Sequence, residues 1–284
     1  MLTGILLTLA AAACFEASYV LQTLEVRAVP SMAHASFGAL RRLAARPVWL
    51  TAIVLGLAGF GLQVLALRHV PLSLAQPLLA VGLLGLLAFS ATVLGEHVGR
   101  REIGAVAAII AGVTAIALAD PQRGEDAAPG LAFLLVAAAL ALLALSAFIP
   151  RAQRSGSNGL LAAAIAADTV AALGAAQAAH ALPEILPALG WCLLAAGGGV
   201  AAIAAESAVL QRRGAARVAP IVLAGQVAVP VALAPLVIGE RWGDAPLLVC
   251  GLALVIAGSA LLAASAGVSR LALGHAEHEV GGSG

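Results

Sequence analysis

The chain has 284 residues, of which 62% are hydrophobic and 10% are charged, and its net charge is +1. A soluble domain is roughly 45–50% apolar and about 25% charged, so this composition excludes two soluble domains. The small net charge excludes a strongly basic nucleic-acid-binding surface. Too few charges are present to cover a water-facing surface, and lipid is therefore the expected solvent.

Apolar runs follow one another along the whole chain. Nine of them have the length of a membrane-crossing helix, about 20 residues, and none shows the alternation of a strand. They cover approximately residues 2–22, 48–67, 71–94, 102–119, 130–149, 159–180, 187–209, 215–238 and 245–265. The sequence therefore predicts an all-α integral membrane protein with about nine transmembrane helices.

Two polar stretches fall outside these runs. Residues 25–47 hold four arginines and are too polar for an ordinary span, so we expect a cytoplasmic, interfacial helix, with a tenth span across 28–46 left open. Residues 267–284 are polar and glycine-rich, which predicts a disordered cytoplasmic tail.

The arginines set the expected orientation, because cytoplasmic loops carry an excess of positive charge. With nine spans, only Arg68, Arg123 and Arg241 lie on the side of the N-terminus, and the other twelve arginines lie on the opposite side. This asymmetry predicts an N-terminus outside and a C-terminus in the cytoplasm. Arginine and alanine usage is typical of a high-GC bacterium, whose inner membrane is the expected location.

The chain also repeats itself. Two triplets of residues have nearly the same spacing. Gln63, Pro77 and Glu96 are separated by 14 and 19 residues, and Glu206, Pro220 and Glu240 by 14 and 20. Spans two to four thus correspond to spans seven to nine, and a shift of five spans makes the two copies cross the membrane in opposite directions. We expect a first repeat of four spans over residues 1–119 and a second of five over 128–266. Inverted repeats are common in secondary transporters, which bind substrate near the midplane.

Residues 46–118 hold an apolar span, a short polar turn with proline, a span with an early proline, Gly-Glu, and a final glycine-containing span. In this order they resemble an EamA-type half of the drug/metabolite transporter superfamily. Residues 187–265 resemble the same half more loosely. The resemblance implies two inverted repeats that move small solutes by alternating access. One of the usual ten spans is missing, and the count of nine also resembles the NIPA-like magnesium transporters, so the substrate class stays open.

Glu16 is the first candidate for the transport site, since ionisable residues inside spans usually face a cavity or a partner. It shares one helical face with Thr8, Ala12, Tyr19 and Thr23. This polar stripe predicts the wall of a wet cavity, in which Glu16 exchanges a proton for a polar or cationic solute. Small multidrug resistance proteins, of the same superfamily, carry a similar first-span glutamate. The alternative is a boundary glutamate bonded to Tyr19 or to an arginine.

Further candidates lie in later spans. Asp168 is in the middle of span six among small apolar neighbours and is either a second solute or proton carboxylate or an interhelix hydrogen-bonding group. Glu206 is a third carboxylate, unless it pairs with a nearby arginine, and its repeat mate is Gln63. Gln76 with Pro77, and Gln226 with Pro230, interrupt spans three and eight and are expected to line the site, with an ordinary kink as the alternative. Tyr19 is also an expected lining residue.

Two other residue types have expected structural roles. Glu96 and Glu240 are the Gly-Glu positions that the family resemblance marks, and we expect them to order the following turn, with a gate as the alternative. Glycines in spans two and seven are expected to allow close helix packing, namely Gly56, Gly59, Gly61, Gly197, Gly198 and Gly199.

The function expected from these features is secondary active transport of a small polar or cationic solute, as proton-coupled efflux. The alternatives are a NIPA-like divalent-cation (Mg²⁺) transporter or channel and a non-transporting membrane partner subunit. The chain has no lysine and so no G-x-x-x-x-G-K-[ST] phosphate loop, and no His/Asp/Ser group has the spacing that a lipid-acting enzyme needs. We expect no catalytic residue, metal site or cofactor. The expected partners are the solute, the lipid bilayer and, as an open alternative, a second copy of the chain.

Overall fold

The computed structural model describes residues 1–27, 46–82, 99–124, 131–146, 157–213 and 215–263. These ranges hold helices and their connections, without a strand, which confirms the all-α prediction at this level. The helices, in chain order, are α1 (Leu2–Arg27), α3 (Pro47–Ala66), α4 (Leu72–Ala80), α6 (Arg100–Leu118), α7 (Leu131–Ser146), α9 (Ser157–Ala181), α10 (Ile185–Arg213), α11 (Ala215–Val237) and α12 (Ala245–Ala263). The expected features over residues 28–45, the tail over 267–284 and Glu96 lie outside the described residues.

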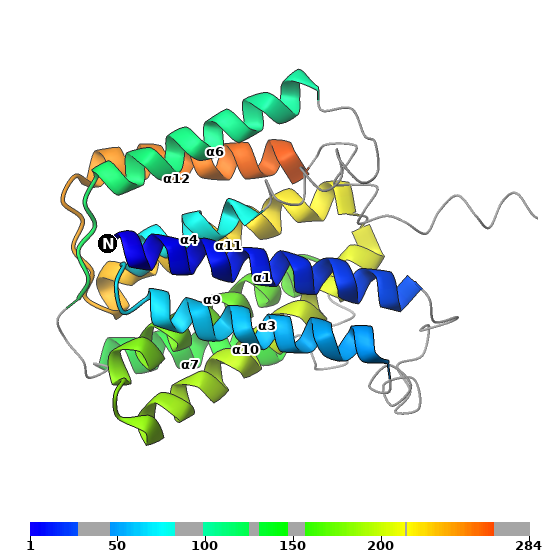
Figure 1. The fold of residues 1–284 in the computed structure, drawn as a ribbon, viewed down its shortest axis with the longest axis horizontal. Coiled ribbons are helices and arrows are strands. Elements are labelled where there is room, and N and C mark those ends of the chain that lie inside the picture. Colours follow the sequence, from blue (N-terminus) through cyan, green and yellow to red (C-terminus); the bar gives the residue numbers. More distant parts are fainter. Residues whose placement is uncertain (28–45, 83–98, 125–130, 147–156, 214, 264–284) are drawn as a thin grey trace, which may run out of the picture.

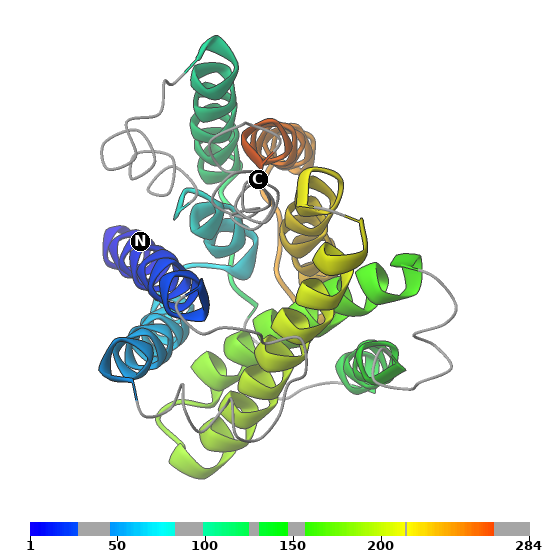
Figure 2. The ribbon, with the colours of Figure 1, turned by 90° about the vertical axis from the view of Figure 1, so that its right-hand side faces the viewer.

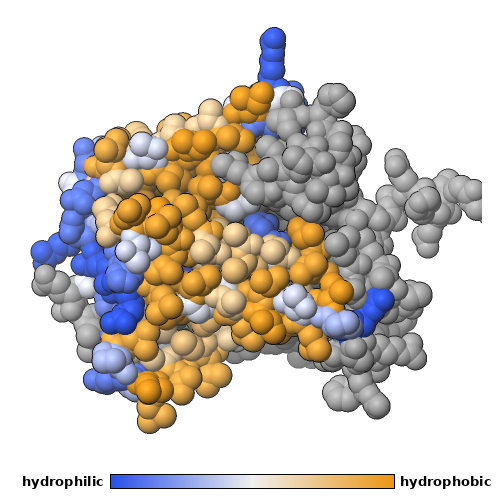
Figure 3. Space-filling view, viewed as in Figure 1, coloured by the Kyte–Doolittle hydropathy of each residue, from blue (hydrophilic) through white to orange (hydrophobic). Residues whose placement is uncertain are grey.

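Five described helices are long and apolar enough to cross a membrane. They are Pro47–Ala66, Arg100–Leu118, Asn158–Ala181, Ile185–Ile203 and Ala245–Leu262. Their outward faces expose large apolar side chains, for example Leu118 and Leu193, which are 71% and 73% exposed. In Figure 3 apolar residues cover most of the coloured face, and polar residues gather along one end. Such a surface fits lipid and not water, so the helices support an integral membrane protein.

The helices pack as a bundle around α9. About two thirds of its apolar window (67%) is buried, against 22% for α3 and α6, because α9 contacts α10, α7, α11 and α3. Three helix pairs run side by side, α1 with α3, α9 with α10 and α6 with α12, while α4 meets α11 near the centre (Figures 1 and 2).

Glycines bring two of these pairs into backbone contact. A Cβ added to Gly251 of α12 would lie 2.7 Å from the carbonyl oxygen of Gly112 in α6, and one on Gly258 would lie 2.7 Å from that of Ala105. Because these partners run in opposite order, α6 and α12 are antiparallel. In α10, a Cβ on Gly198 would lie 2.8 Å from the carbonyl oxygen of Ala167 in α9. No larger residue fits these positions without moving a helix.

The glycines expected from the sequence divide into two groups. A Cβ on Gly56 or Gly59 would lie 3.1 Å from atoms of α1, so these positions and Gly198 do permit close packing. Gly61, Gly197 and Gly199 face open space, with no atom within 4 Å of an added Cβ, and for them the packing prediction is wrong.

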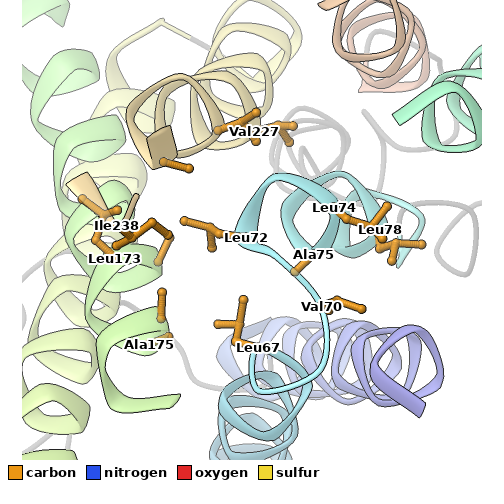
Figure 4. Packing of buried hydrophobic residues seen from close by; sticks show 14 of the residues in the cluster. Leu67, Val70, Leu72, Leu74, Ala75, Leu78, Leu173, Ala175, Val227 and Ile238 are labelled. Carbon is orange, nitrogen blue, oxygen red and sulfur yellow. The ribbon is translucent and has the colours of Figure 1, made fainter. Parts of the chain in front are cut away.

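A continuous apolar core fills the end of the bundle where α4 begins. Most of its residues come from α4, from the turn that precedes it, and from α9 and α11, and others from α3, α6, α10 and α12. Figure 4 shows part of this core near the start of α4. Pro71 is at the N-cap of α4 with φ −68°. Proline suits a helix start because its ring fixes φ near this value and it has no N–H to leave unpaired. Helix α4 therefore begins inside the core, with Leu72 only 1% exposed.

Candidate functional site

Glu16 of α1 lies against the far end of α4. A Cβ added to Gly82, two residues beyond the last residue of α4, would lie 3.1 Å from Glu16 Cγ and 3.2 Å from its Oε1. The third neighbour of that point is Ala12, one turn earlier in α1, at 3.3 Å. Glycine at this position thus leaves the space that the carboxylate occupies.

The Glu16 carboxylate has no hydrogen-bond donor among the residues that the structure describes. Its residue is partly exposed, which leaves it within reach of a solute or a proton. An ionised carboxylate away from bulk water is costly unless it is paired. Such a group is suited to taking up a proton or a cation.

The polar stripe expected on α1 is shorter than the sequence indicates. Thr8 is fully buried, and its hydroxyl donates a 2.8 Å hydrogen bond to the carbonyl of Gly4 within the same helix. Thr8 therefore lines no cavity, and that part of the prediction is wrong. The side chains of Tyr19 and Thr23 lie outside the described residues.

Asp168 of α9 lies next to a second glycine contact. It is partly exposed and it interacts with a neighbouring group. A Cβ added to Gly225 of α11 would lie 2.4 Å from Cδ1 of Ile165, three residues earlier on α9, so the Ile165 side chain would have to move. A carboxylate-bearing helix thus packs on a glycine in both places, with Glu16 beside Gly82 and Asp168 one turn from the contact at Gly225.

The remaining candidates lie on the helices that surround this region. Gln63 near the end of α3 and Gln76 in α4 are buried, with 8% and 7% exposed, while Gln226 of α11 is partly exposed. The side chain of Glu206 lies outside the described residues. The structure does not bring these candidates into one hydrogen-bonded cluster over the ranges it describes.

One buried polar group was missed from the sequence. Gln177 of α9 is 2% exposed, and its Oε1 atom is buried and has no donor among the residues that the structure describes. The signal that could have found it is a lone amide in an alanine-rich span, since Ala175, Ala176, Ala178 and Ala179 surround it in the sequence.

A buried carboxylate, that of Glu240, lies between α11 and α12 and binds the start of α4. It is 5% exposed, and its carboxylate accepts hydrogen bonds from the backbone N–H of Leu72, from the N–H of Ser73 at 3.1 Å, and from the Ser73 hydroxyl. The indole N–H of Trp242 donates to the same hydroxyl at 3.1 Å. Since the first N–H groups of a helix have no partner inside it, Glu240 supplies what α4 lacks at its N-terminus.

Positive charge and backbone contacts surround Glu240. Arg123 lies near it and donates a hydrogen bond to the carbonyl of Arg68. Burial raises the pKa of Glu240, and its hydrogen bonds and Arg123 oppose that rise without cancelling it. Burial also lowers the pKa of Arg123. Gln122 and Arg241 exchange two backbone hydrogen bonds of 2.7 and 3.1 Å.

These contacts join three connections of the chain at one end of the bundle. They are the turn before α4, the segment after α6 and the connection between α11 and α12. We call this set of contacts the Glu240 network, comprising Arg68, Leu72, Ser73, Gln122, Arg123, Glu240, Arg241 and Trp242. The sequence predicted that Glu240 orders the turn that follows it. In the structure its carboxylate binds the start of α4, which lies 168 positions away in the sequence.

Three kinds of comparison with known proteins give no further identification. No family model matches the chain, no curated protein matches it, and no solved structure matches it. Over the residues that the structure describes, no group of three or more His, Cys, Asp or Glu side chains could hold a metal ion. The site must therefore be interpreted from its own chemistry.

Proposed function

We propose that the protein is a secondary transporter that moves a small polar or cationic solute by alternating access and exchanges it for protons at Glu16. The observation that carries the proposal is the placement of the Glu16 carboxylate against Gly82, with no donor in the described part of the chain. A carboxylate in this position gains from binding either a proton or a cationic group, and the two compete. This competition is the simplest basis for coupled exchange.

The pairing of helices supports two inverted repeats. Helices α1 and α3 pack together as α9 and α10 do, α4 packs on α11, and α6 packs on α12. If α1, α3, α4 and α6 are matched in order with α9, α10, α11 and α12, each of these contacts in one repeat has an equivalent in the other or is shared between them. The sequence repeat agrees, because the same interval of 143 residues separates Gln63 from Glu206, Pro77 from Pro220 and Gly82 from Gly225.

The glycine pair supports a shared site between the repeats. Gly82 meets α1 at Ala12 and Glu16, and Gly225 meets α9 at Ile165, one turn from Asp168. The 143-residue interval does not pair Glu16 with Asp168, but each of these carboxylates lies on the helix that packs against one glycine of the pair. We propose Glu16 as the exchanging carboxylate and Asp168 as its counterpart, with Gln76 and Gln226 on the paired helices α4 and α11 as lining residues.

The test uses purified protein in liposomes that contain a pH-sensitive dye, with a panel of amino acids, cationic drugs, metabolites and Mg²⁺ added outside. Wild type and Glu16→Gln are compared with the control Glu184→Gln, which changes an exposed carboxylate between α9 and α10. We expect solute-dependent proton flux in wild type and in the control and none in Glu16→Gln.

Other outcomes reject parts of the proposal. Flux that survives Glu16→Gln removes the exchange role from Glu16 and assigns it to Asp168 or Glu206. Mg²⁺ uptake without proton flux supports a divalent-cation transporter or channel instead. A chain that is unstable alone and moves no solute supports a partner subunit.

A further inference from the structure

We propose that the contact between Glu240 and the first turn of α4 is a gate, which closes one end of the solute pathway and must break before a solute can enter from that end. The inference rests on the proposed function, because a gate has meaning only in a protein that alternates its access. It goes beyond that function because Glu240 lies outside the Glu16 site.

The contact joins parts that alternating access must separate. Helix α4 belongs to the proposed first repeat, and Glu240 and Trp242 lie between α11 and α12 of the second. Within the described ranges, the hydrogen bonds that the Glu240 carboxylate accepts come from Leu72 and Ser73. Movement of α4 away from the end of α11 therefore has to break these bonds together.

The gate and the Glu16 site lie at opposite ends of one short helix. Helix α4 has nine residues, which corresponds to a length of roughly 13 Å at 1.5 Å per residue. Its first turn binds Glu240, and Gly82, just beyond its last turn, faces Glu16. A displacement of α4 consequently changes both the Glu240 contact and the Glu16 contact. Occupation of the Glu16 site is in this way linked to opening of the gate.

The chemistry of the contact is suited to reversible opening. When the contact breaks, water can replace the lost hydrogen bonds to a carboxylate, a hydroxyl and two N–H groups, so the net cost is modest. The α6–α12 pair is different, because its backbones touch at Gly112 and Gly251 and separating them would leave a dry gap with lost dispersion contacts. Water can therefore replace the Glu240 contact when it opens, whereas the α6–α12 contact is better suited to stay closed.

Apolar side chains lie directly behind the gate. Leu67, Leu72 and Ile238 are 3%, 1% and 5% exposed, and Figure 4 shows them converging beside the start of α4. A polar solute that entered beside the start of α4 would have to displace these buried apolar side chains. The proposed gate is therefore closed in this structure.

The test measures accessibility and does not depend on transport. A single reporter cysteine replaces Gln76, which is 7% exposed and lies one turn past Ser73, in a chain whose Cys14, Cys192 and Cys250 are changed to alanine. A membrane-impermeant maleimide is added from the side that carries the Glu240 network. We expect Glu240→Ala to raise the labelling rate about tenfold and Ser73→Ala by a smaller factor, because Ser73→Ala keeps both backbone donors. Glu184→Ala is the matched control and should leave the rate unchanged.

A second reporter separates gate opening from general loosening. Ser259 of α12 is 1% exposed, and a cysteine there should label at the same low rate with and without Glu240→Ala. An equal rise at both reporters, or no rise at Gln76→Cys, overturns the gate. Should Glu240→Ala fail to fold, Trp242→Phe replaces it, since Trp242 contributes one hydrogen bond to the contact. If the gate variants label faster while no solute moves protons, the gate stands and the coupled transport of the proposed function fails.

Discussion

Glu16 and Glu240 are the same residue type at opposite ends of α4, yet their surroundings differ completely. Glu240 accepts three hydrogen bonds from Leu72 and Ser73 and is 5% exposed. Glu16 meets the glycine that follows α4 and has no donor in the described ranges. The first N–H groups of α4 have no partner inside the helix, so they are free to donate to Glu240. Glu240 therefore stabilises the structure, whereas Glu16 is available to exchange a proton or a cation in the proposed mechanism.

The largest expected effect on proton flux comes from filling the space that Glu16 occupies. In Gly82→Val the added Cβ would lie 3.1 Å from Glu16 Cγ, and the further methyl groups must displace the carboxylate. Overpacking of this kind costs roughly 1–3 kcal/mol, so we expect solute-driven proton flux to fall about tenfold or more. The measurement is the initial rate of flux in liposomes. The control is Gly61→Val, because a Cβ at Gly61 meets no atom within 4 Å, and equal losses in both variants would exclude a special role for Gly82.

The next prediction concerns the free energy of unfolding, which should change in opposite directions when Glu240 and Glu16 are replaced. Glu240→Ala leaves the N–H groups of Leu72 and Ser73 and the Ser73 hydroxyl without their acceptor, and we expect the free energy of unfolding to fall by about 3 kcal/mol. Glu16→Gln removes an unpaired charge, so the free energy of unfolding should stay unchanged or rise by up to about 1 kcal/mol. Thermal unfolding of both variants in one detergent measures the contrast. A clear loss of stability in Glu16→Gln would mean that Glu16 has a structural partner.

The sequence could predict the helices but not their partners. Apolar runs placed α3, α9 and α12 within a few residues of their observed ends, because span length follows from bilayer thickness. The same sequence gave no indication that Glu240 binds Leu72, which is 168 positions away, or that Gly112 opposes Gly251. Such contacts depend on how helices pack in space, and spacing along one helix carries no information about them.

Predictions about the Glu16 site are limited in the same way, because spacing along one helix does not show what the neighbouring helices contact. Helical spacing correctly put Ala12 and Glu16 on one face, where both meet Gly82. It also put Thr8 on that face, although Thr8 is buried and bonded to its own helix. Periodicity states which residues share a face, and only the neighbouring helix decides whether that face is wet.

The pH dependence of stability gives a smaller effect that also distinguishes the carboxylates. Burial raises the pKa of Glu240 above its ordinary value of 4.5, so the folded protein holds that proton at a higher pH than the unfolded chain does. The stabilising contribution is full below about pH 4.5 and is lost as the pH rises through the pKa of the folded state. The slope is at most about 1.4 kcal/mol per pH unit. Glu240→Gln should remove this part of the slope.

The comparison of wild type with Glu240→Gln is made by thermal unfolding between pH 4 and 8 in steps of roughly one unit. Arg123, the charged group that acts on Glu240, and the charged residues of the connected segments, Arg68, Asp120, Arg241 and Asp244, are kept in both proteins. Identical slopes would show that Glu240 does not change its protonation on unfolding in this range. A wild-type stability that rises more steeply with pH than that of Glu240→Gln would show that the hydrogen bonds and Arg123 outweigh burial.

The smallest expected effect tests whether the contacts around Ser73 act one by one or together. Trp242→Phe keeps an aromatic ring in the core and removes the indole N–H, whose bond to the Ser73 hydroxyl is 3.1 Å long. A single neutral hydrogen bond is worth about 0.5–1.5 kcal/mol, so the free energy of unfolding should fall by that amount, against no change in the control Trp49→Phe. A hydroxyl that accepts from Trp242 donates more strongly to Glu240, because hydrogen bonds in a chain polarise one another. A loss in Trp242→Phe as large as that in Glu240→Ala would therefore show that the network breaks as one unit, which is the behaviour that a gate with two discrete states requires.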